Sequence, residues 1–420
     1  MQYTNQRKEA LKNFEGRSEI SDDENVLEKL YKILNEDFEP FGKSLQAIMR
    51  EKLGRDLGDL VVELKEACKK TGVPIKDIAS KTETIQHWFY GKTIKGTRKT
   101  TYPRPKKSDD SRSSMFAFAF AMELSDEETE RLFHNAYLDR AFNFRDYREL
   151  IYYYCLRNGL SYEQAQSMIS SVDLTCISVT TDKTILTRNI ALDALQMDSA
   201  DDLIEFIYKN GHNFSINAKS AKATMLKLKK EAKILSAKAY DSDREKHQKK
   251  KMEEIARRKN EGRWNREWRE KLDCDEVFEN SKGYKKQRES DRNLYITITD
   301  VSMGKIDGIT TISLKGSELP KEISNNFPQV TSLNENTESF EELRKVIILL
   351  ASYCFWEMRA GEDKFFNKYI IEVNGYLYDA NLPELYYGNP YDWLFLLCTT
   401  TPSPLKNFQF ILQQALQKDD

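Results

Sequence analysis

The sequence predicts a mainly α, multi-module helical protein with at most a small β-hairpin. Glycine and proline are scarce, at 17 and 10 of 420 residues, so the chain has few residues that favour sharp turns. Apolar residues recur at helical spacing through most of the chain, and only residues 294–315 show hairpin-like alternation. Hydrophobic residues make up 40% of the chain, which is enough to form folded cores, and the length predicts about two to three domains.

The N-terminal region predicts two helices followed by a basic loop. Apolar residues at i, i+3 and i+4 indicate helices within residues 24–53 and over residues 57–71, the second of which ends at Gly72. Residues 92–114 are basic, contain two prolines and are rich in hydroxyl side chains, so we expect a loop there. The apolar segment that follows, residues 115–122, is expected to be a buried helix.

Capping patterns place three further helices. Ser125 is followed three residues later by Glu128, which is the capping-box pattern, and we expect a helix from there to Ala136. A second helix is predicted from Asp146 to Leu156, and Ser161 is the expected cap of a third. These helices continue the α pattern on the C-terminal side of the basic loop.

Several motifs follow one another within residues 57–137. Leu60–Lys70 is an amphipathic segment, Val73–Ala79 has the sequence VPIKDIA, and Thr84–Lys92 has the sequence TIQHWFYGK. Phe116–Thr129 then supplies an apolar helix and the capping box. With these motifs the segment resembles the lambda-repressor-like (XRE) helix-turn-helix family. The resemblance implies a helical bundle that binds DNA, with the helix beginning near Thr84 as the recognition helix.

The resemblance also implies which residues contact DNA. Thr84, Gln86 and His87 belong to the implied recognition helix; Gln can form two hydrogen bonds to adenine, and Thr can contact a thymine methyl group. Glu83 repels phosphate, so we expect the neighbouring basic loop to compensate. Residues 81–107 contain eight Lys and Arg against one acidic residue. The expected phosphate contacts are Lys92, Lys95, Arg98, Lys99, Arg104, Lys106 and Lys107.

Two features depart from the family pattern. Only six residue steps separate Ala79 from Ile85, where the family has about ten, so the second and third helices need not cross at the usual angle of about 90–120°. The loop over residues 92–114 is also longer than the usual link. The alternative interpretation is a helical bundle that kept the fold and lost DNA binding.

The chain also predicts an internal repeat. Cys155 and Ile169 are 14 residues apart, Cys398 and Ile411 are 13 apart, and both pairs follow an apolar helix and a Tyr-rich segment. We interpret the C-terminal module as a possible diverged repeat of residues 115–170 at an offset of about 240 residues. Chance similarity between two Tyr- and Leu-rich regions is the alternative.

The C-terminal segment Tyr386–Cys398 resembles segments of uncharacterised helix-turn-helix proteins of Firmicutes, and its apolar run Trp393–Leu397 is expected in the core. We therefore divide the chain into five modules. These are an N-terminal helical extension (1–56), a helix-turn-helix-like domain (57–140), a helical middle module (141–217), a long basic helix or linker (218–272) and a C-terminal aromatic-rich helical module (273–420).

Residues 218–272 predict a long helix with few large apolar contacts. Residues 211–270 contain 18 Lys and Arg against nine acidic residues, although the whole chain has a net charge of −2. Trp264 and Trp268 share one helix face. One interpretation is a second nucleic-acid surface formed by Arg257, Arg258, Arg263 and Arg266. The other is a helix that bridges the N-terminal and C-terminal modules through its two Trp side chains.

The sequence predicts no enzyme, cofactor or metal site. Common phosphate-binding, hydrolase and HExxH metalloprotease motifs are absent, and no two of the six cysteines are closer than 21 residues. The longest apolar run, Val346–Trp356, has 11 residues where a membrane span needs about 20. The N-terminus lacks the apolar segment of a signal peptide. We therefore expect a cytoplasmic protein with reduced thiols and no membrane contact.

The sequence thus favours a cytoplasmic bacterial DNA-binding protein, active in transcription regulation or as an accessory of a phage-defence system. DNA is the expected partner, and a protein partner is compatible with the helical modules. The alternative function is a helical protein-interaction scaffold without nucleic-acid binding. The sequence leaves the oligomeric state and the target DNA sequence open.

Overall fold

The computed structural model describes residues 40–93 apart from 55, residues 100–173 apart from 102, most of 190–235, residues 321–328 apart from 325 and residues 339–416 apart from 360–364, with a few isolated residues elsewhere. The prediction of a mainly α fold is confirmed. Over these ranges the only strands are β1 (Lys92–Thr93) and β2 (Thr100–Thr101), an antiparallel pair. None of the helices described is long and apolar enough to span a bilayer. The hairpin predicted at 294–315 lies outside the described residues.

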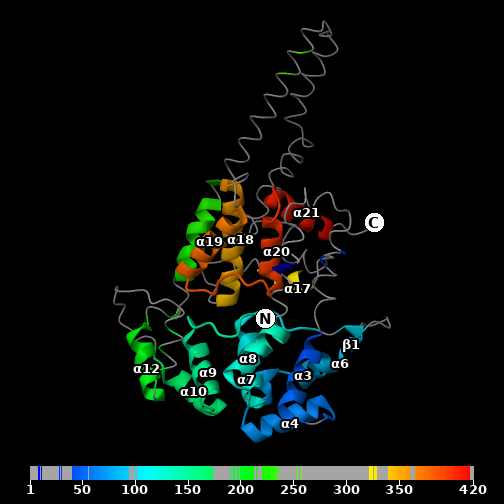
Figure 1. Ribbon diagram of the computed structural model, residues 1–420, viewed down its shortest axis with the longest axis vertical. Coiled ribbons are helices and arrows are strands. Elements are labelled where there is room, and N and C mark those ends of the chain that lie inside the picture. Colours follow the sequence, from blue (N-terminus) through cyan, green and yellow to red (C-terminus); the bar gives the residue numbers. More distant parts are fainter. Residues whose placement is uncertain are drawn as a thin grey trace.

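The helices lie in two groups (Figure 1), and each group encloses a hydrophobic core. The N-terminal core is built from α3 (Phe41–Leu53), α4 (Leu60–Thr71), α5 (Ile75–Ile78), α6 (Thr82–Tyr90), α7 (Asp109–Ala121), α8 (Asp126–Leu132), the π-helical turn η3 (Phe133–Tyr137), α9 (Tyr147–Arg157), α10 (Tyr162–Ser171) and α12 (Ala200–Lys209). The C-terminal core is built from α17 (Lys321–Ser324), α18 (Phe340–Arg359), α19 (Phe365–Asp379), α20 (Pro390–Thr399) and α21 (Pro404–Leu416).

These cores group the chain more coarsely than the five predicted modules do. Helix α3, which the sequence analysis placed in the N-terminal extension, packs in the same core as residues 57–140 and the middle module 141–217. The first turns of the predicted long helix, within residues 220–235, pack on the C-terminal core through Ala221, Met225 and Leu228. Trp393 is fully buried there, so its predicted core position is confirmed.

Local capping explains where most helices begin. The predicted capping box is present at Ser125 with Glu128, and the predicted cap Ser161 forms a second capping box with Gln164. Helix α8 ends at Leu132, however, and the continuous helix expected to Ala136 is replaced by η3. The Asp139 N–H closes this turn by donating to the Phe133 carbonyl at 3.1 Å.

Helix α7 begins six residues earlier than the sequence predicted. The loop expected to run to residue 114 ends at Ser108, whose side chain accepts from the Ser111 N–H, and the first turn carries Asp109 and Asp110. Acidic side chains are favourable at a helix N-terminus because they oppose its positive dipole. The predicted buried helix 115–122 is confirmed as the C-terminal part of α7.

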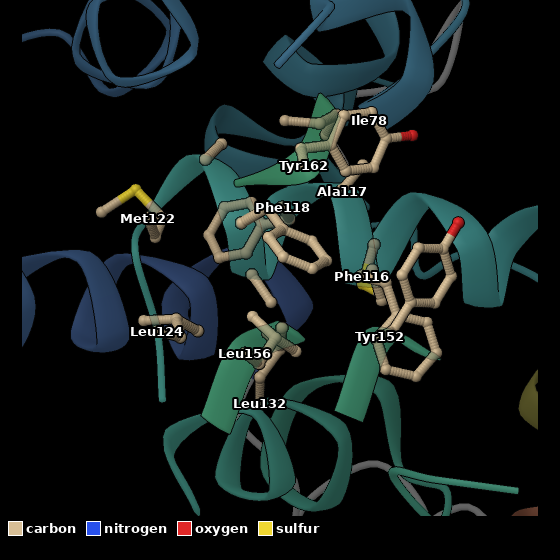
Figure 2. Packing of buried hydrophobic residues seen from close by; sticks show 14 of the residues in the cluster. Ile78, Phe116, Ala117, Phe118, Met122, Leu124, Leu132, Tyr152, Leu156 and Tyr162 are labelled. Atoms are coloured by element: carbon tan, nitrogen blue, oxygen red, sulfur yellow. The ribbon is translucent and has the colours of Figure 1, made fainter. Parts of the chain in front are cut away.

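Helix α7 is the centre of the N-terminal core, packing against α4, α5, α8 and α10 (Figure 2). Phe116 stacks on Tyr152, with 4.9 Å between ring centroids, and Phe120 lies 5.5 Å from the Tyr162 ring. Phe118 is also fully buried. Burial on every face of residues 115–121 of α7 therefore ties the helix-turn-helix-like segment to α9 and α10.

The same Arg–carboxylate pair occurs once in each core. In the N-terminal core, Arg112 on α7 donates from Nε and Nη2 to the two carboxylate oxygens of Glu149 on α9, at 2.7 and 2.8 Å. In the C-terminal core, Arg344 on α18 donates from Nη1 and Nη2 to those of Asp392 on α20, at 2.9 and 2.6 Å. Each carboxylate is the third residue after the cap of its helix.

The loops that precede α9 and α20 match as well. Each arginine also donates to two successive loop carbonyls, those of residues 140–141 in one core and 383–384 in the other. A loop N–H, from Asn143 or Tyr386, donates to the paired carboxylate at 2.6 or 2.8 Å. Residues 143 and 386 are 243 positions apart, close to the offset of about 240 that the repeat predicts.

Helices α3 and α6 approach so closely that Gly42 admits no side chain. A Cβ atom placed on Gly42 lies 1.7 Å from the backbone oxygen of Trp88. Beside it the Phe41 and Trp88 rings meet edge to face, with centroids 5.2 Å apart. The position of α6 on the N-terminal core therefore depends on this glycine.

We predict that Gly42→Ala destabilises the chain by about 1–3 kcal/mol, because the added methyl group must push α3 away from α6. Gly375→Ala in α19 is the matched control, since nothing lies within 4 Å of its added Cβ. Removing a helical glycine at such a site stabilises by about 0.5–1 kcal/mol. Urea denaturation measures both changes, and a neutral Gly42→Ala would contradict the close approach.

Candidate nucleic-acid interface

Helix α6, the implied recognition helix, is held on the N-terminal core by one face. Ile85, Trp88 and Phe89 are buried, and α6 packs on α3 and α4. Gln86 is exposed and His87 is half-buried. Helix α5 has only one turn, so the short spacing noted in the sequence is accommodated by a shortened second helix.

A groove of about 450 Å³ lies between α6, the start of α7 and residues 103–106. Trp88 and Met115 contribute apolar lining, and Asp110, Ser111 and Ser114 add polar groups from α7. Five of the residues predicted to bind DNA line this groove: Thr84, His87, Lys92, Arg104 and Lys106. The structure therefore brings residues of α6 and of the basic segment 103–106 to one concave site.

The remaining predicted contacts have different positions. Gln86 is exposed on α6 but does not line the groove. His87, which lines the groove, also lies one turn from Glu83, with 3.6 Å between its Nε2 and the Glu83 Oε1. The side chains of Lys95, Arg98 and Lys99 lie outside the described residues. So do Arg258, Arg263 and Arg266 of the possible second surface, whereas Arg257 is exposed.

Strands β1 and β2 lie within the first part of the predicted basic loop 92–114, directly after α6 in the chain. Lys92 pairs with Thr101, and Thr93 pairs with Thr100. The sequence analysis expected a loop throughout this region and missed the ladder. Threonines at both ends of the segment favour extended structure and were the available indication.

Lys107 does not belong to the DNA-contacting set. Its side chain is buried, and the ammonium nitrogen lies 3.5 Å from the centroid of the Tyr137 ring. Among the described residues Nζ has no hydrogen-bond partner. Burial lowers the pKa of Lys107 to about 7, and the negative charge of Asp139 opposes that shift. The ammonium faces the interior, so the predicted phosphate contact is wrong.

Behind Lys107, a cluster of buried charged side chains joins the two cores. Arg112 lies 3.4 Å from Asp139 and 3.9 Å from Glu341 of α18. The Asp109 carboxylate accepts from the N–H groups of Phe340 and Glu341, at 3.1 and 3.2 Å, and so caps the N-terminus of α18. Burial, reinforced by Asp139, raises the pKa of Glu341 to about 7.

No sequence pattern predicted this cluster of buried charges between the two cores, which we call the interface cluster. An arginine in the first turns of an apolar helix is the feature that Arg112 and Arg344 share, and it was the available indication. Such residues are usually exposed, and nothing local shows that two helices more than 200 residues apart meet at their N-termini. Within the described ranges, no group of three or more His, Cys, Asp or Glu has a geometry suited to a metal ion.

Comparison of the chain with protein-family models, with curated proteins and with solved structures finds no match. The resemblance to lambda-repressor-like proteins therefore stays a prediction, carried by the motifs within residues 57–137. The geometry of the groove and of the interface cluster is the remaining basis for a functional argument.

We predict that Lys107→Met stabilises the chain at pH 7 by about 1–4 kcal/mol, because it removes a buried charge that lacks a hydrogen-bond partner. The folded-state pKa of about 7 lies below the ordinary value of 10.5. Between these values the unfolded chain binds more protons than the folded chain, so the wild-type free energy of unfolding rises with pH. The advantage of the Met variant should therefore shrink from pH 7 to pH 10.

Urea denaturation at pH 7 and at pH 9.5 measures this difference. Lys106→Met is the control, because this neighbouring lysine is exposed and its removal should change the pH dependence little. A Lys107→Met variant that is less stable than the wild type at pH 7 would show that the attraction to Tyr137 and Asp139 outweighs the cost of burial.

Proposed function

We propose that the chain binds double-stranded DNA through α6 and the neighbouring groove, as a cytoplasmic bacterial regulator of transcription or an accessory of a phage-defence system. The observation that carries the proposal is the meeting of Thr84 and His87 from α6 with Lys92, Arg104 and Lys106 in one groove. Base-edge donors and phosphate-binding cations on one face are what a recognition helix requires.

The parts of the site have separate roles in this proposal. Exposed Gln86, with Thr84, supplies base contacts in the major groove, where Gln forms two hydrogen bonds to adenine. Lys92, Arg104 and Lys106 contact phosphates, which positions α6 and supplies sequence-independent affinity. Pro103 and Pro105 restrict the backbone beside Arg104, so the cation is presented at a lower entropic cost.

The second candidate is a helical protein-interaction scaffold. The acidic side chains of Glu83 on α6 and Asp110 in the groove favour it, because both repel phosphate. A scaffold of this kind predicts no salt-dependent binding to DNA. The two functions are therefore separated by a measurement of affinity against ionic strength.

We predict that the triple variant Lys92→Ala, Arg104→Ala and Lys106→Ala binds all DNA sequences more weakly. The slope of log K against log salt concentration is negative, and removing one phosphate-binding cation should reduce its magnitude by about one unit. The slope of the triple variant should therefore be shallower by about two to three units. Fluorescence anisotropy with genomic DNA fragments at about 50–300 mM salt measures the slope, because phosphate contacts are screened over this range.

The matched control removes three exposed lysines far from α6: Lys209 on α12, Lys227 in residues 220–232 and Lys368 on α19. Its net charge is the same as that of the groove variant, so an equal fall in affinity would mean that binding follows total charge rather than the groove. A wild-type chain that does not bind DNA at low salt would overturn the proposal and favour the scaffold.

A further inference from the structure

The basic segment 103–107, of which residues 103–106 line the groove, is held by the C-terminal core. The N–H of Lys107 donates to Oδ1 of Asn326 at 2.9 Å, and its carbonyl accepts from Nζ of Lys345 at 2.9 Å. These partners are 219 and 238 residues further along the chain. Both backbone polar groups of Lys107 are thus satisfied by side chains of the other core.

The two partners are themselves fixed. Lys345 is 4% exposed, its Nζ also donates to Glu342 at 2.8 Å, and its carbonyl accepts from the Tyr391 hydroxyl at 2.8 Å. Asn326 is buried and precedes Phe327, whose ring lies 5.3 Å from the Tyr391 ring. Both therefore belong to the packing around Tyr391 at the start of α20.

The position of Lys107 determines that of the groove cations. Lys106 and Arg104 line the groove one and three residues earlier, and the neighbouring prolines restrict the backbone of this segment. The Lys106 carbonyl accepts from the Ser111 hydroxyl and from the Tyr137 hydroxyl, so this stretch of chain has anchors on both cores. A shift of Asn326 or Lys345 is therefore transmitted along a short, stiff segment.

We propose that Asn326 and Lys345 are positioning residues for DNA binding, through which the C-terminal core sets the placement of Arg104 and Lys106. The inference rests on the proposed function and adds its regulation: a rearrangement around Tyr391 that releases the Lys107 peptide withdraws two phosphate-binding cations without touching α6. Neither positioning residue lines the groove, so their effect on DNA is exerted through Lys107.

The test uses the full chain with Asn326→Ala and, independently, Lys345→Met. Each variant should raise the Kd for DNA about 5- to 20-fold. Each should also reduce the magnitude of the salt slope by about one to two units, because Arg104 and Lys106 no longer reach the phosphates. In the absence of DNA, trypsin should cleave after Lys106 and Lys107 faster than in the wild-type chain.

Asn407→Ala is the matched control. Asn407 is fully buried in the C-terminal core and donates to Thr401 and Ser403, within its own core. If Asn326 and Lys345 only stabilise the fold, all three variants should lose active protein in proportion to their loss of thermal stability. The protein that remains active should then have the salt slope of the wild type. We expect Asn407→Ala to keep that slope and the wild-type cleavage pattern.

The outcomes separate this inference from the proposed function. DNA binding by the wild type with unchanged slopes and cleavage in both variants would overturn the inference alone. A wild-type chain that does not bind DNA would overturn both, whatever the cleavage pattern. Lower slopes and faster cleavage in either variant, set against an unchanged Asn407→Ala, support the positioning role.

Discussion

Each core depends on one buried arginine that bridges two of its helices, α7 and α9 in the N-terminal core and α18 and α20 in the C-terminal core. Arg112 and Arg344 are almost inaccessible to water, and burying a guanidinium costs several kcal/mol unless its donors are satisfied. In both cores a bidentate pair of hydrogen bonds to a carboxylate, together with hydrogen bonds to two loop carbonyls, satisfies these donors. Because the carboxylate lies in the first turn of α9 or α20, the pair fixes helix, loop and helix together.

The charges that remain beside these pairs join the cores to each other. Asp109 accepts from the first N–H groups of α18, and Glu341 of α18 faces Arg112. Helix N-termini carry exposed donors and a partial positive charge, so carboxylates are suited to hold two of them at one point. The contact between the cores thus includes directional polar bonds at the N-termini of α7 and α18.

Local sequence patterns predicted most of the helices but not which helices pack against one another. Periodicity and the caps at Ser125 and Ser161 placed helices because capping is a property of four consecutive residues. The start of α7 was missed because prolines and hydroxyl residues favour a loop, although the cap that Ser108 forms with the Ser111 N–H is local. The five predicted modules likewise do not show that α3 and α10 share one core.

Two adjacent residues of the candidate site show the same limit of prediction from local sequence. Lys106 and Lys107 are chemically identical in the sequence, and a count of charges predicts a phosphate contact for both. In an extended chain successive side chains point to opposite sides, so one ammonium lines the groove and the other faces the Tyr137 ring. Which side is inside is decided by Asn326 and Lys345, and contacts over 219 and 238 residues leave no local pattern. The orientation of the cations in the basic segment therefore depends on residues of the C-terminal core. The helix-turn-helix-like segment taken alone would lack the partners that orient them.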